Sequence, residues 1–307
     1  MKGGIKMRTF CPEGQLIKKH TLLNLNAINE AIISGEIFEG IAMVCDNNYN
    51  LIVDMGGIKG VILKDEGGIG IKEGNVKEIA LISRVGKPVC FVIKKLLYDD
   101  NGKPYCLLSR KQAQERCLKH IHNLPVGSIL NAKITHLENF GAFCDIGCGN
   151  IALLPIDAIS VSRISHPSDR FSVGDNIRVI IKNIDEKGRI SLSHKELLGT
   201  WLENANRFKA GQTVSGVVRS VEEYGVFVEL APNLAGLAEP KNNVKVGQTA
   251  SVYIKSIIPE KMKIKLIIID SFFGDNDKAF DYYYNEDFID KWQYSPDCSI
   301  KTVVSLF

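Results

Sequence analysis

Apolar and polar residues alternate in the stretch "NFGAFCDIG", near the middle of the chain. Alternate side chains of a strand share a face, so Ala142, Cys144 and Ile146 are predicted on one side. Phe143 then lies on the other side, together with Asp145. The pattern predicts a strand with a buried face of small apolar residues and an aromatic ring on its charged face.

Two other stretches repeat this pattern, "EYGVFVEL" and "NYNLIVDMG". Aligned on the first aromatic residue, the three stretches place Tyr49, Phe140 and Tyr224 at intervals of 91 and 84 residues. Each is preceded by an apolar strand and followed by a Gly-bounded strand, a long strand opened by "VG", a basic turn and a last apolar strand. The repeats therefore predict three small all-β domains, each with five short strands.

Five strands within so short a repeat favour a closed or nearly closed barrel, because closure removes exposed sheet edges. An aromatic-Gly-x-Phe strand, a GLVH-like strand, a "VGD" strand and "RISLS" in this order resemble the S1-type OB domain of bacterial ribosomal protein S1. The second repeat matches well, the third less so, and the first diverges. The resemblance covers residues 35–270 and is closest to the three-domain S1-like proteins of anaerobic Gram-positive bacteria. It implies an all-β chain of three tandem five-stranded OB-fold barrels with short connecting helices.

Helix formers and apolar spacing predict helices outside the barrels, at Leu25–Ser34, Leu108–Leu124 and Ser193–Phe208. The last two are interpreted as spacers and packing elements. The predicted organisation is an N-terminal segment with a helix (1–34), a divergent first domain (35–111), a second domain (126–196), a third domain (209–270) and an acidic, aromatic tail (271–307).

Four aromatic residues suggest what the second and third domains bind. Phe143 and Phe227 share a strand face with an acid, and Phe140 and Tyr224 precede a glycine, where a bend can redirect a side chain. The four rings are expected to form two solvent-facing platforms. Unpaired bases stack on such rings while nearby cations follow the phosphates, so the pattern predicts binding of single-stranded RNA.

The family resemblance implies further RNA contacts, at residues that match the family's motif. They are Asp185 and Arg189 in the last hairpin of the second repeat, Lys263 in the third, and Tyr49 in the first.

This sequence also departs from the family's motif in each repeat. Pro155 occupies the position of the GLVH histidine in the second repeat, and Glu239 occupies it in the third. In the first repeat, Ile52 and Leu63 stand at the second aromatic and histidine positions.

Supporting cations are expected around the second platform. Lys133 is predicted on an outward strand face, and Arg163, His166 and Arg170 lie in the basic loop "SRISHPSDRF", which is long enough to close over RNA. Two alternatives stay open: His166 as a loop-packing residue, and the string "KMKIKL" around Lys263 as a solvated strand face that discourages aggregation.

The charge is unevenly divided along the chain. The net charge is +3, but the tail from Asp270 onward has three lysines and eight acids, which leaves a body of net charge +8 that suits a polyanionic partner. No apolar run approaches the roughly 18 residues that span a bilayer, and the start lacks the apolar stretch of a secretory signal. We expect a cytoplasmic protein with no membrane partner. The eight cysteines show no CxxC pair, and no metal or cofactor is expected.

These observations favour a non-enzymatic binder of single-stranded RNA that acts on messenger RNA in or around translation. The alternative is a protein-docking adaptor on the ribosome or an RNA-processing complex. This role would fall to the first domain, because residues 35–107 contain nine basic and ten acidic residues and so carry almost no net charge. No P-loop, HExxH motif or nucleophile elbow occurs, so an enzyme is not expected.

The tail is too rich in aromatic residues to remain in water without cost. One interpretation is that it packs on the third barrel. The other is that it covers the basic, RNA-facing side of that barrel.

Overall fold

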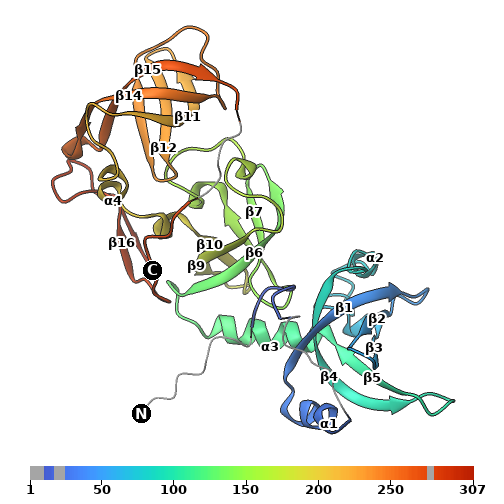
Figure 1. Cartoon of the computed structure of the whole chain (residues 1–307). Coiled ribbons are helices and arrows are strands. Elements are labelled where there is room, and N and C mark those ends of the chain that lie inside the picture. The colour runs from blue at the N-terminus through green and yellow to red at the C-terminus, as the bar shows by residue number, and fades with distance from the viewer. Residues whose placement is uncertain (1–9, 17–24, 275–279) are drawn as a thin grey trace. The chain divides into compact units, whose positions relative to one another are not determined.

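The computed structural model describes residues 10–16, 25–274 and 280–307 (Figure 1). Parts of the predicted N-terminal segment and tail, residues 1–9, 17–24 and 275–279, lie outside the described residues. The chain forms two compact units. Unit 1 contains the chain up to Leu124 with residues 131–133 and 145–151, and unit 2 contains the remainder. Three closed five-stranded barrels confirm the predicted fold class.

The first barrel is formed by β1 (Ile37–Cys45), β2 (Leu51–Asp54), β3 (Lys59–Ile62), β4 (Pro88–Tyr98) and β5 (Pro104–Ser109). They close in the order β1-β2-β3-β5-β4, with β3 and β5 parallel. Alternation directs Phe38, Leu51 and Phe91 into the core, where Ile28 and Ala31 of α1 (Leu25–Ser34) join them. Between β3 and β4 lie η2 (Lys64–Glu66) and α2 (Ile79–Ile82).

A glycine in the opening strand of the first and third barrels allows the strands to cross closely. A Cβ atom at Gly40 would lie 2.7 Å from the carbonyl oxygen of Asp54, and one at Gly216 would lie 2.6 Å from that of Glu229. Any larger residue would push the first two strands apart, so closure of these barrels depends on glycine at this position.

Helix α3 (Arg110–His122) follows β5 and agrees with the predicted connecting helix. The side chain of Ser109 accepts a hydrogen bond of 3.0 Å from the backbone N–H of Gln112, which caps the first turn.

The second barrel consists of β6 (Ile129–Glu138), β7 (Gly141–Asp145), β8 (Ile151–Pro155), β9 (Asn176–Ile184) and β10 (Ile190–Ser193). It closes in the same cyclic order as the first barrel. The short helices η3 (Ile156–Ala158) and η4 (Pro167–Asp169) lie in the long loop before β9. Cys144 is fully buried, as the alternation predicted.

The helix predicted over Ser193–Phe208 is interrupted. The structure has η5 (Lys195–Leu198) and α4 (Trp201–Ala205), separated by Gly199 in a left-handed conformation with φ of 84°. Thr200 then starts α4 with a capping box, in which its side chain and that of Glu203 each accept a backbone N–H of the other. Apolar spacing alone did not reveal this break.

The third barrel is formed by β11 (Thr213–Glu222), β12 (Gly225–Ala231), β13 (Leu234–Ala238), β14 (Thr249–Ile258) and β15 (Lys263–Phe272), with η6 (Pro259–Lys261) between the last two strands. Its order is β11-β12-β13-β15-β14. Trp201 of α4 packs into its core cluster, which also contains Ile180 of the second barrel.

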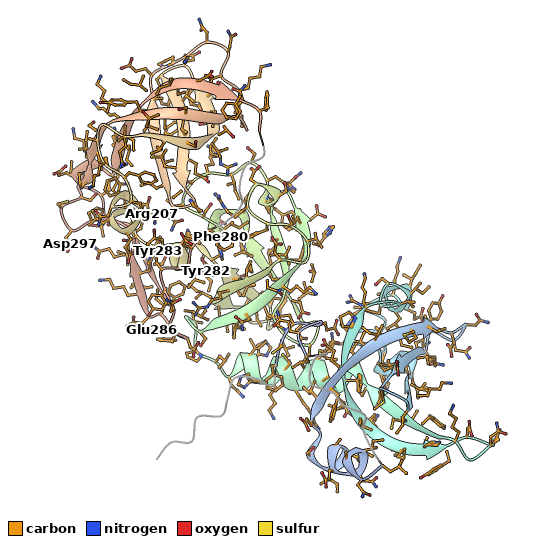
Figure 2. All side chains as sticks on the ribbon, viewed as in Figure 1. Arg207, Phe280, Tyr282, Tyr283, Glu286 and Asp297 are labelled. Atoms are coloured by element: carbon orange, nitrogen blue, oxygen red, sulfur yellow. The ribbon has the colours of Figure 1, made fainter. Side chains whose placement is uncertain are left out.

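The described tail, residues 280–307, packs on both barrels of unit 2 (Figure 2). Phe280 and Tyr282 lie against His194 of the second barrel, while Trp292 and Tyr294 join the core cluster of the third. Strands β16 (Lys291–Gln293) and β17 (Val304–Leu306) form a hairpin. The tail thus packs on the third barrel, as one interpretation expected, and it also packs on the second barrel, which was not foreseen.

Candidate nucleic-acid interface

An aromatic pair is exposed on the outer face of the second barrel. Phe140 lies in the turn before β7 and is 56% exposed, and Phe143 on β7 is half-buried. Their ring centroids are 5.9 Å apart in an edge-to-face arrangement. A Cβ atom at Gly141 would lie 2.5 Å from the carbonyl oxygen of Leu154, so glycine lets this turn lie against β8 and directs the Phe140 ring outward.

The third barrel repeats this pair. Tyr224 is 67% exposed, Phe227 is half-buried, and their ring centroids are 6.2 Å apart, again edge to face. A Cβ atom at Gly225 would lie 2.5 Å from the carbonyl oxygen of Ala238. Two barrels therefore present one exposed and one half-buried ring at equivalent positions, which gives each barrel a surface on which a planar base can stack.

The described tail does not cover these rings, so the interpretation that it shields the RNA-facing side is wrong for residues 280–307. Ile300 donates a backbone hydrogen bond of 3.0 Å to the carbonyl oxygen of Glu260, beside the last hairpin of the third barrel. Lys261 and Lys263 in that hairpin nevertheless stay exposed, as does Tyr224.

The acids that share a strand face with the platform rings are not solvated. Asp145 and Glu229 are both buried. The face is the outer side of the barrel, as the alternation predicted, but other segments cover the acid-bearing end of the strand. In Glu229, burial acts to raise the pKa, and the hydrogen bonds and charges of Arg170 and Arg219 outweigh it, so the pKa lies below its usual value.

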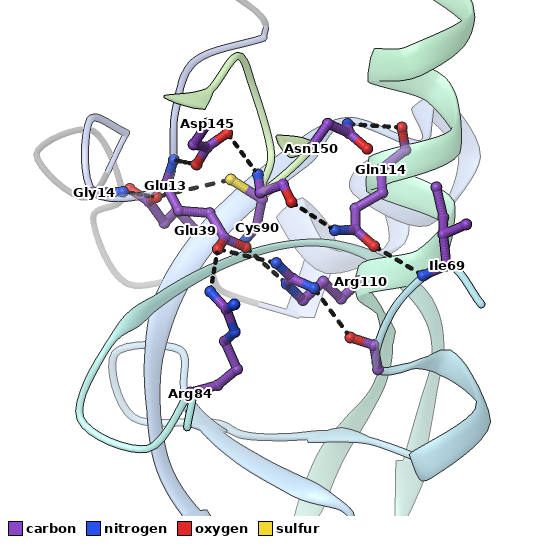
Figure 3. Close-up of polar contacts among 12 residues, drawn as sticks. Glu13, Gly14, Glu39, Ile69, Arg84, Cys90, Arg110, Gln114, Asp145 and Asn150 are labelled. Carbon is purple, nitrogen blue, oxygen red and sulfur yellow. Dashed lines mark hydrogen bonds and ion pairs between the residues drawn. The ribbon is translucent and has the colours of Figure 1, made fainter. Parts of the chain in front are cut away.

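Asp145 is covered within unit 1 by the segment around Glu13 (Figure 3). Its carboxylate accepts backbone N–H groups of Glu13 at 2.8 Å, Gly147 at 2.8 Å and Gly149 at 3.0 Å. Arg110 donates to the Glu13 carboxylate at 2.8 and 3.1 Å. Burial and the neighbouring Glu13 charge raise the pKa of Asp145 to about 6, although the three N–H donors act in the opposite direction.

Comparison with known proteins identifies one barrel directly. Residues 123–195 match the S1 RNA binding domain family. The match spans the whole second barrel. Over 185 residues the chain is 34% identical to the small ribosomal subunit protein bS1 of Leuconostoc lactis, covering 54% of this chain and 43% of that protein. The bS1 homolog of Bacillus subtilis is 30% identical over 199 residues, with 59% and 51% covered. The chain thus spans about half the length of these relatives.

These matches confirm the resemblance to ribosomal protein S1, and the matched family is a binding family and not an enzyme family. A multidomain protein with nucleic acid binding domains from Streptococcus pneumoniae is a similar solved structure, with 15% identity, a TM-score of 0.25 and coverage of 79% of this chain and 76% of that chain. None of the helices among the described residues has the length and apolar character needed to cross a bilayer.

Among the predicted cations of the second barrel, Arg189 is accessible to solvent. Its side chain is 76% exposed, and its Nε donates to Asp185 Oδ2 at 2.7 Å. The hydrogen bonds from the Arg189 side chain and backbone lower the pKa of Asp185, the backbone bond contributing most. The pair thus holds a guanidinium at the hairpin with donors free for a phosphate.

The remaining predicted cations divide into accessible and occupied groups. Arg163 and Lys263 are exposed. Lys133 is half-buried and donates to the Glu13 carbonyl oxygen at 3.2 Å, which draws it to the N-terminal segment. His166 caps η4, because its Nδ1 accepts the backbone N–H of Ser168 at 3.1 Å. That contact fits the loop-packing interpretation.

Arg170 must be removed from the predicted RNA-binding residues. It is only 4% exposed, and both of its terminal nitrogens bind Glu229, at 2.8 and 2.9 Å. A guanidinium that is buried and paired in this way has no face left for a phosphate. The loop sequence showed a basic residue but not the acid of another barrel that holds it.

His136 was missed in the sequence and belongs beside the platform. It is exposed, and its ring lies 6.3 Å from that of Phe143 in a stacked arrangement. Strict alternation from Ala132 and Ile134 would place it inside the barrel. In the third barrel the equivalent residue, Ser220, lies opposite Phe227 after a bulge in β11. A bulge shifts the alternation by one residue, so only an expected bulge at this repeat position would have revealed His136.

The first barrel lacks an aromatic pair. Tyr49 is half-buried with a φ of 61°, and Ile52 takes the second ring position. Beside Tyr49 lies an open depression of about 850 Å³ with polar and charged walls. Its lysines are largely paired within the protein, Lys64 with Glu78 at 3.2 Å and Lys111 with Glu73 at 2.6 Å. This face offers little net positive charge to RNA.

No metal centre accompanies these surfaces. Within residues 10–16, 25–274 and 280–307, no group of three or more His, Cys, Asp or Glu side chains is arranged to hold a metal ion.

Proposed function

We propose that this chain binds single-stranded RNA through the aromatic platforms of its second and third barrels and acts on messenger RNA in or around translation. The observation that supports this most is the recurrence of one exposed and one half-buried ring in two barrels, Phe140 with Phe143 and Tyr224 with Phe227. The similarity of the chain to bS1 proteins supports such an activity and, with it, a cytoplasmic role at the ribosome.

The magnitudes favour joint use of two barrels. Each base stacked on an aromatic ring contributes roughly 1–3 kcal/mol, and ordering the flexible strand offsets part of that sum. One platform alone therefore binds weakly. When two platforms are linked, the second contact becomes intramolecular and affinity rises by about a hundredfold or more if the spacing suits.

Exposed cations supply the phosphate contacts. Arg189 and Arg163 belong to the second barrel and Lys263 to the third, and all three are exposed. Contacts of this kind release counterions from RNA, so affinity must fall as salt rises.

The test is a titration of the full chain with a mixed-sequence single-stranded RNA at several salt concentrations, alongside a fully paired duplex of the same sequence. We expect tight binding to the single strand that weakens steadily with salt, and much weaker binding to the duplex, whose bases cannot stack on protein rings. Absent or salt-insensitive binding to the single strand would contradict the proposal.

A second candidate function is docking to a ribosomal or RNA-processing partner through the first barrel. The observation in its favour is the surface beside Tyr49, where lysines and acids pair with one another and the second ring is absent. Co-sedimentation of the chain with ribosomes separates the two functions. A variant with all four platform rings replaced by alanine should lose free RNA binding but still sediment with ribosomes if the first barrel docks.

A further inference from the structure

The second and third barrels of unit 2 are joined by a buried ion cluster. Arg170, in the loop before β9, donates to Glu229 of β12, and its Nη2 also donates to Ser160 Oγ at 3.2 Å. From the other side, Arg219 of β11 donates to the Glu229 carboxylate at 3.0 and 3.3 Å and lies 3.7 Å from Asp169. An ion pair buried between two domains keeps its geometry because separation would leave a charge uncompensated.

A second junction surrounds Asn233, in the turn between β12 and β13. Its side chain is fully buried, donates to the carbonyl oxygens of Lys195 at 2.7 Å and Gly199 at 2.8 Å, and accepts the backbone N–H of Val161 at 2.9 Å. All of its polar atoms are used in binding the loops that precede and follow β9 and β10. The turn of the third barrel is thereby fixed to the second.

The tail adds a third junction across the same two barrels. Arg178 of β9 donates to the carbonyl oxygens of Tyr284 and Glu286, the latter at 2.6 Å. Farther along, the hydroxyl of Tyr294 donates to the Asn233 carbonyl oxygen at 2.7 Å, and its carbonyl oxygen accepts the Trp201 N–H at 3.0 Å. The tail therefore connects β9 of the second barrel to the turn of the third.

We propose that these three junctions make the second and third barrels one rigid RNA-binding body, in which Arg170, Arg178 and Asn233 are positioning residues that fix one platform relative to the other. The inference rests on the proposed function. In this proposal the acidic tail supports RNA binding, because it helps to hold the two platforms in place, and it does not mask them.

The junction lies directly beside the platform. Glu229 is two residues from Phe227 on the same strand and the same outer face, so the ion cluster fixes the strand that carries the ring. The equivalent acid of the first barrel, Asp54, is exposed, and that of the second, Asp145, binds the segment around Glu13. The arginine contact is thus particular to the junction between the second and third barrels.

Rigidity has a measurable consequence for RNA of different lengths. A short oligonucleotide binds to one platform only, so its affinity does not depend on the junctions. A long one gains a second, intramolecular contact, whose effective concentration is high only if the platforms are held at a fixed spacing. Loosening the junctions should therefore weaken binding of long RNA and leave short RNA unchanged.

The test compares the full chain with the double variant Arg170→Met and Arg178→Met, using single strands of about 6 and about 24 nucleotides, chosen around the site size of one OB fold. Arg219 stays paired with Glu229 in this variant, so no lone carboxylate is buried and the barrels should fold. Affinity for the long strand should fall about tenfold or more, with less than about twofold change for the short strand. The control Lys209→Met and Lys245→Met removes two exposed positive charges elsewhere and should change both affinities equally.

Backbone ¹⁵N relaxation of the unaltered chain provides an independent check. The amides of the second and third barrels should report one common rotational correlation time. Separate correlation times, or unchanged long-strand affinity in the arginine double variant, would overturn the inference while the proposed function stood. Failure of the unaltered chain to bind either strand would overturn the proposed function itself.

Discussion

The first barrel and the other two share a strand order but differ on their outer faces. Inside, all three bury alternating small and branched apolar residues, and the order of the strands around the barrel is the same. Outside, the second and third carry an aromatic pair, where the first has Tyr49 and Ile52 among paired lysines and acids. Closure of the barrel thus constrains which residues can occupy the inner face. The residues of the outer face can differ between barrels, and with them the ligand that each barrel binds.

Removing the rings should give the largest effect and tests this comparison directly. Replacement of Phe140, Phe143, Tyr224 and Phe227 by alanine should weaken RNA binding by at least about a hundredfold, since each stacked base contributes about 1–3 kcal/mol. Fluorescence anisotropy with a labelled single strand measures the change. Tyr49→Ala in the first barrel should alter affinity by less than about twofold, and an equal loss would show that all three barrels bind alike.

His194 makes unit 2 sensitive to acid. The imidazole is buried, its Nδ1 donates to the Ile159 carbonyl oxygen at 2.9 Å, and burial lowers its pKa from 6.5 to about 4. A lowered pKa means that the folded state excludes the charged ring, so the stability it contributes is present above pH 6.5 and is lost as the pH falls toward 4. The loss should be about 3 kcal/mol, at roughly 1.4 kcal/mol for each pKa unit.

Urea unfolding followed by tryptophan fluorescence measures this effect, because both tryptophans, Trp201 and Trp292, lie in unit 2. In the His194→Gln variant, the free energy of unfolding of unit 2 should change much less between pH 6.5 and pH 4. An equally steep dependence in this variant would place the acid sensitivity elsewhere.

Asp145 should give unit 1 the opposite dependence. Its pKa is raised to about 6, so the folded state favours the neutral carboxyl, and the stability linked to it is present below pH 3.8 and is lost as the pH rises through about 6. Asp145→Asn keeps one oxygen, which can accept the N–H groups of Gly147 and Gly149, and places an NH2 group opposite the N–H of Glu13, a loss that is the same at every pH. Relative to the unaltered chain, the stability of unit 1 in this variant should therefore be higher at pH 8 than at pH 4 by about 3 kcal/mol, at roughly 1.4 kcal/mol for each pKa unit. Hydrogen exchange of the α3 amides at both pH values measures this, and a stability difference between variant and unaltered chain that does not change with pH would contradict it.

Substitution of His136 should have the smallest effect on RNA affinity. The residue is present beside the platform of the second barrel only, so this substitution tests whether the two platforms differ. Its ring extends the platform of the second barrel, where the third has Ser220. His136→Ala should weaken binding of single-stranded RNA by no more than about tenfold, the lower end of the contribution of one stacked ring. Ser220→Ala serves as the matched control and should have no effect in the same anisotropy measurement.

The barrels and their ring pairs could be predicted because both follow from local alternation and from repetition. Alternation identifies the side of a strand on which a residue lies, and it did so correctly for Phe143 and Phe227. It carries no information about what covers that side. The burial of Asp145 by the Glu13 segment and of Glu229 by Arg170 depends on contacts between residues 132 and 59 positions apart.

Bulges and helix breaks account for the other differences. His136 is displaced from strict alternation by one position, and Gly199 interrupts an otherwise regular apolar spacing. Both are single-residue features of the backbone that side-chain hydrophobicity does not record. The packing of the tail against His194 was likewise unforeseen, because a run of aromatic residues indicates that a surface will be covered without indicating which one.

Trp292 and Tyr294 belong to the hydrophobic cluster that contains the core of the third barrel, and this has a consequence for synthesis of the chain. Translation proceeds from the N-terminus, so the five strands of that barrel leave the ribosome before these two rings exist. Until they follow, Trp201 and its neighbours lack part of their packing. A product that terminates before residue 292 would expose this apolar surface, and cellular proteases could distinguish it from a finished molecule.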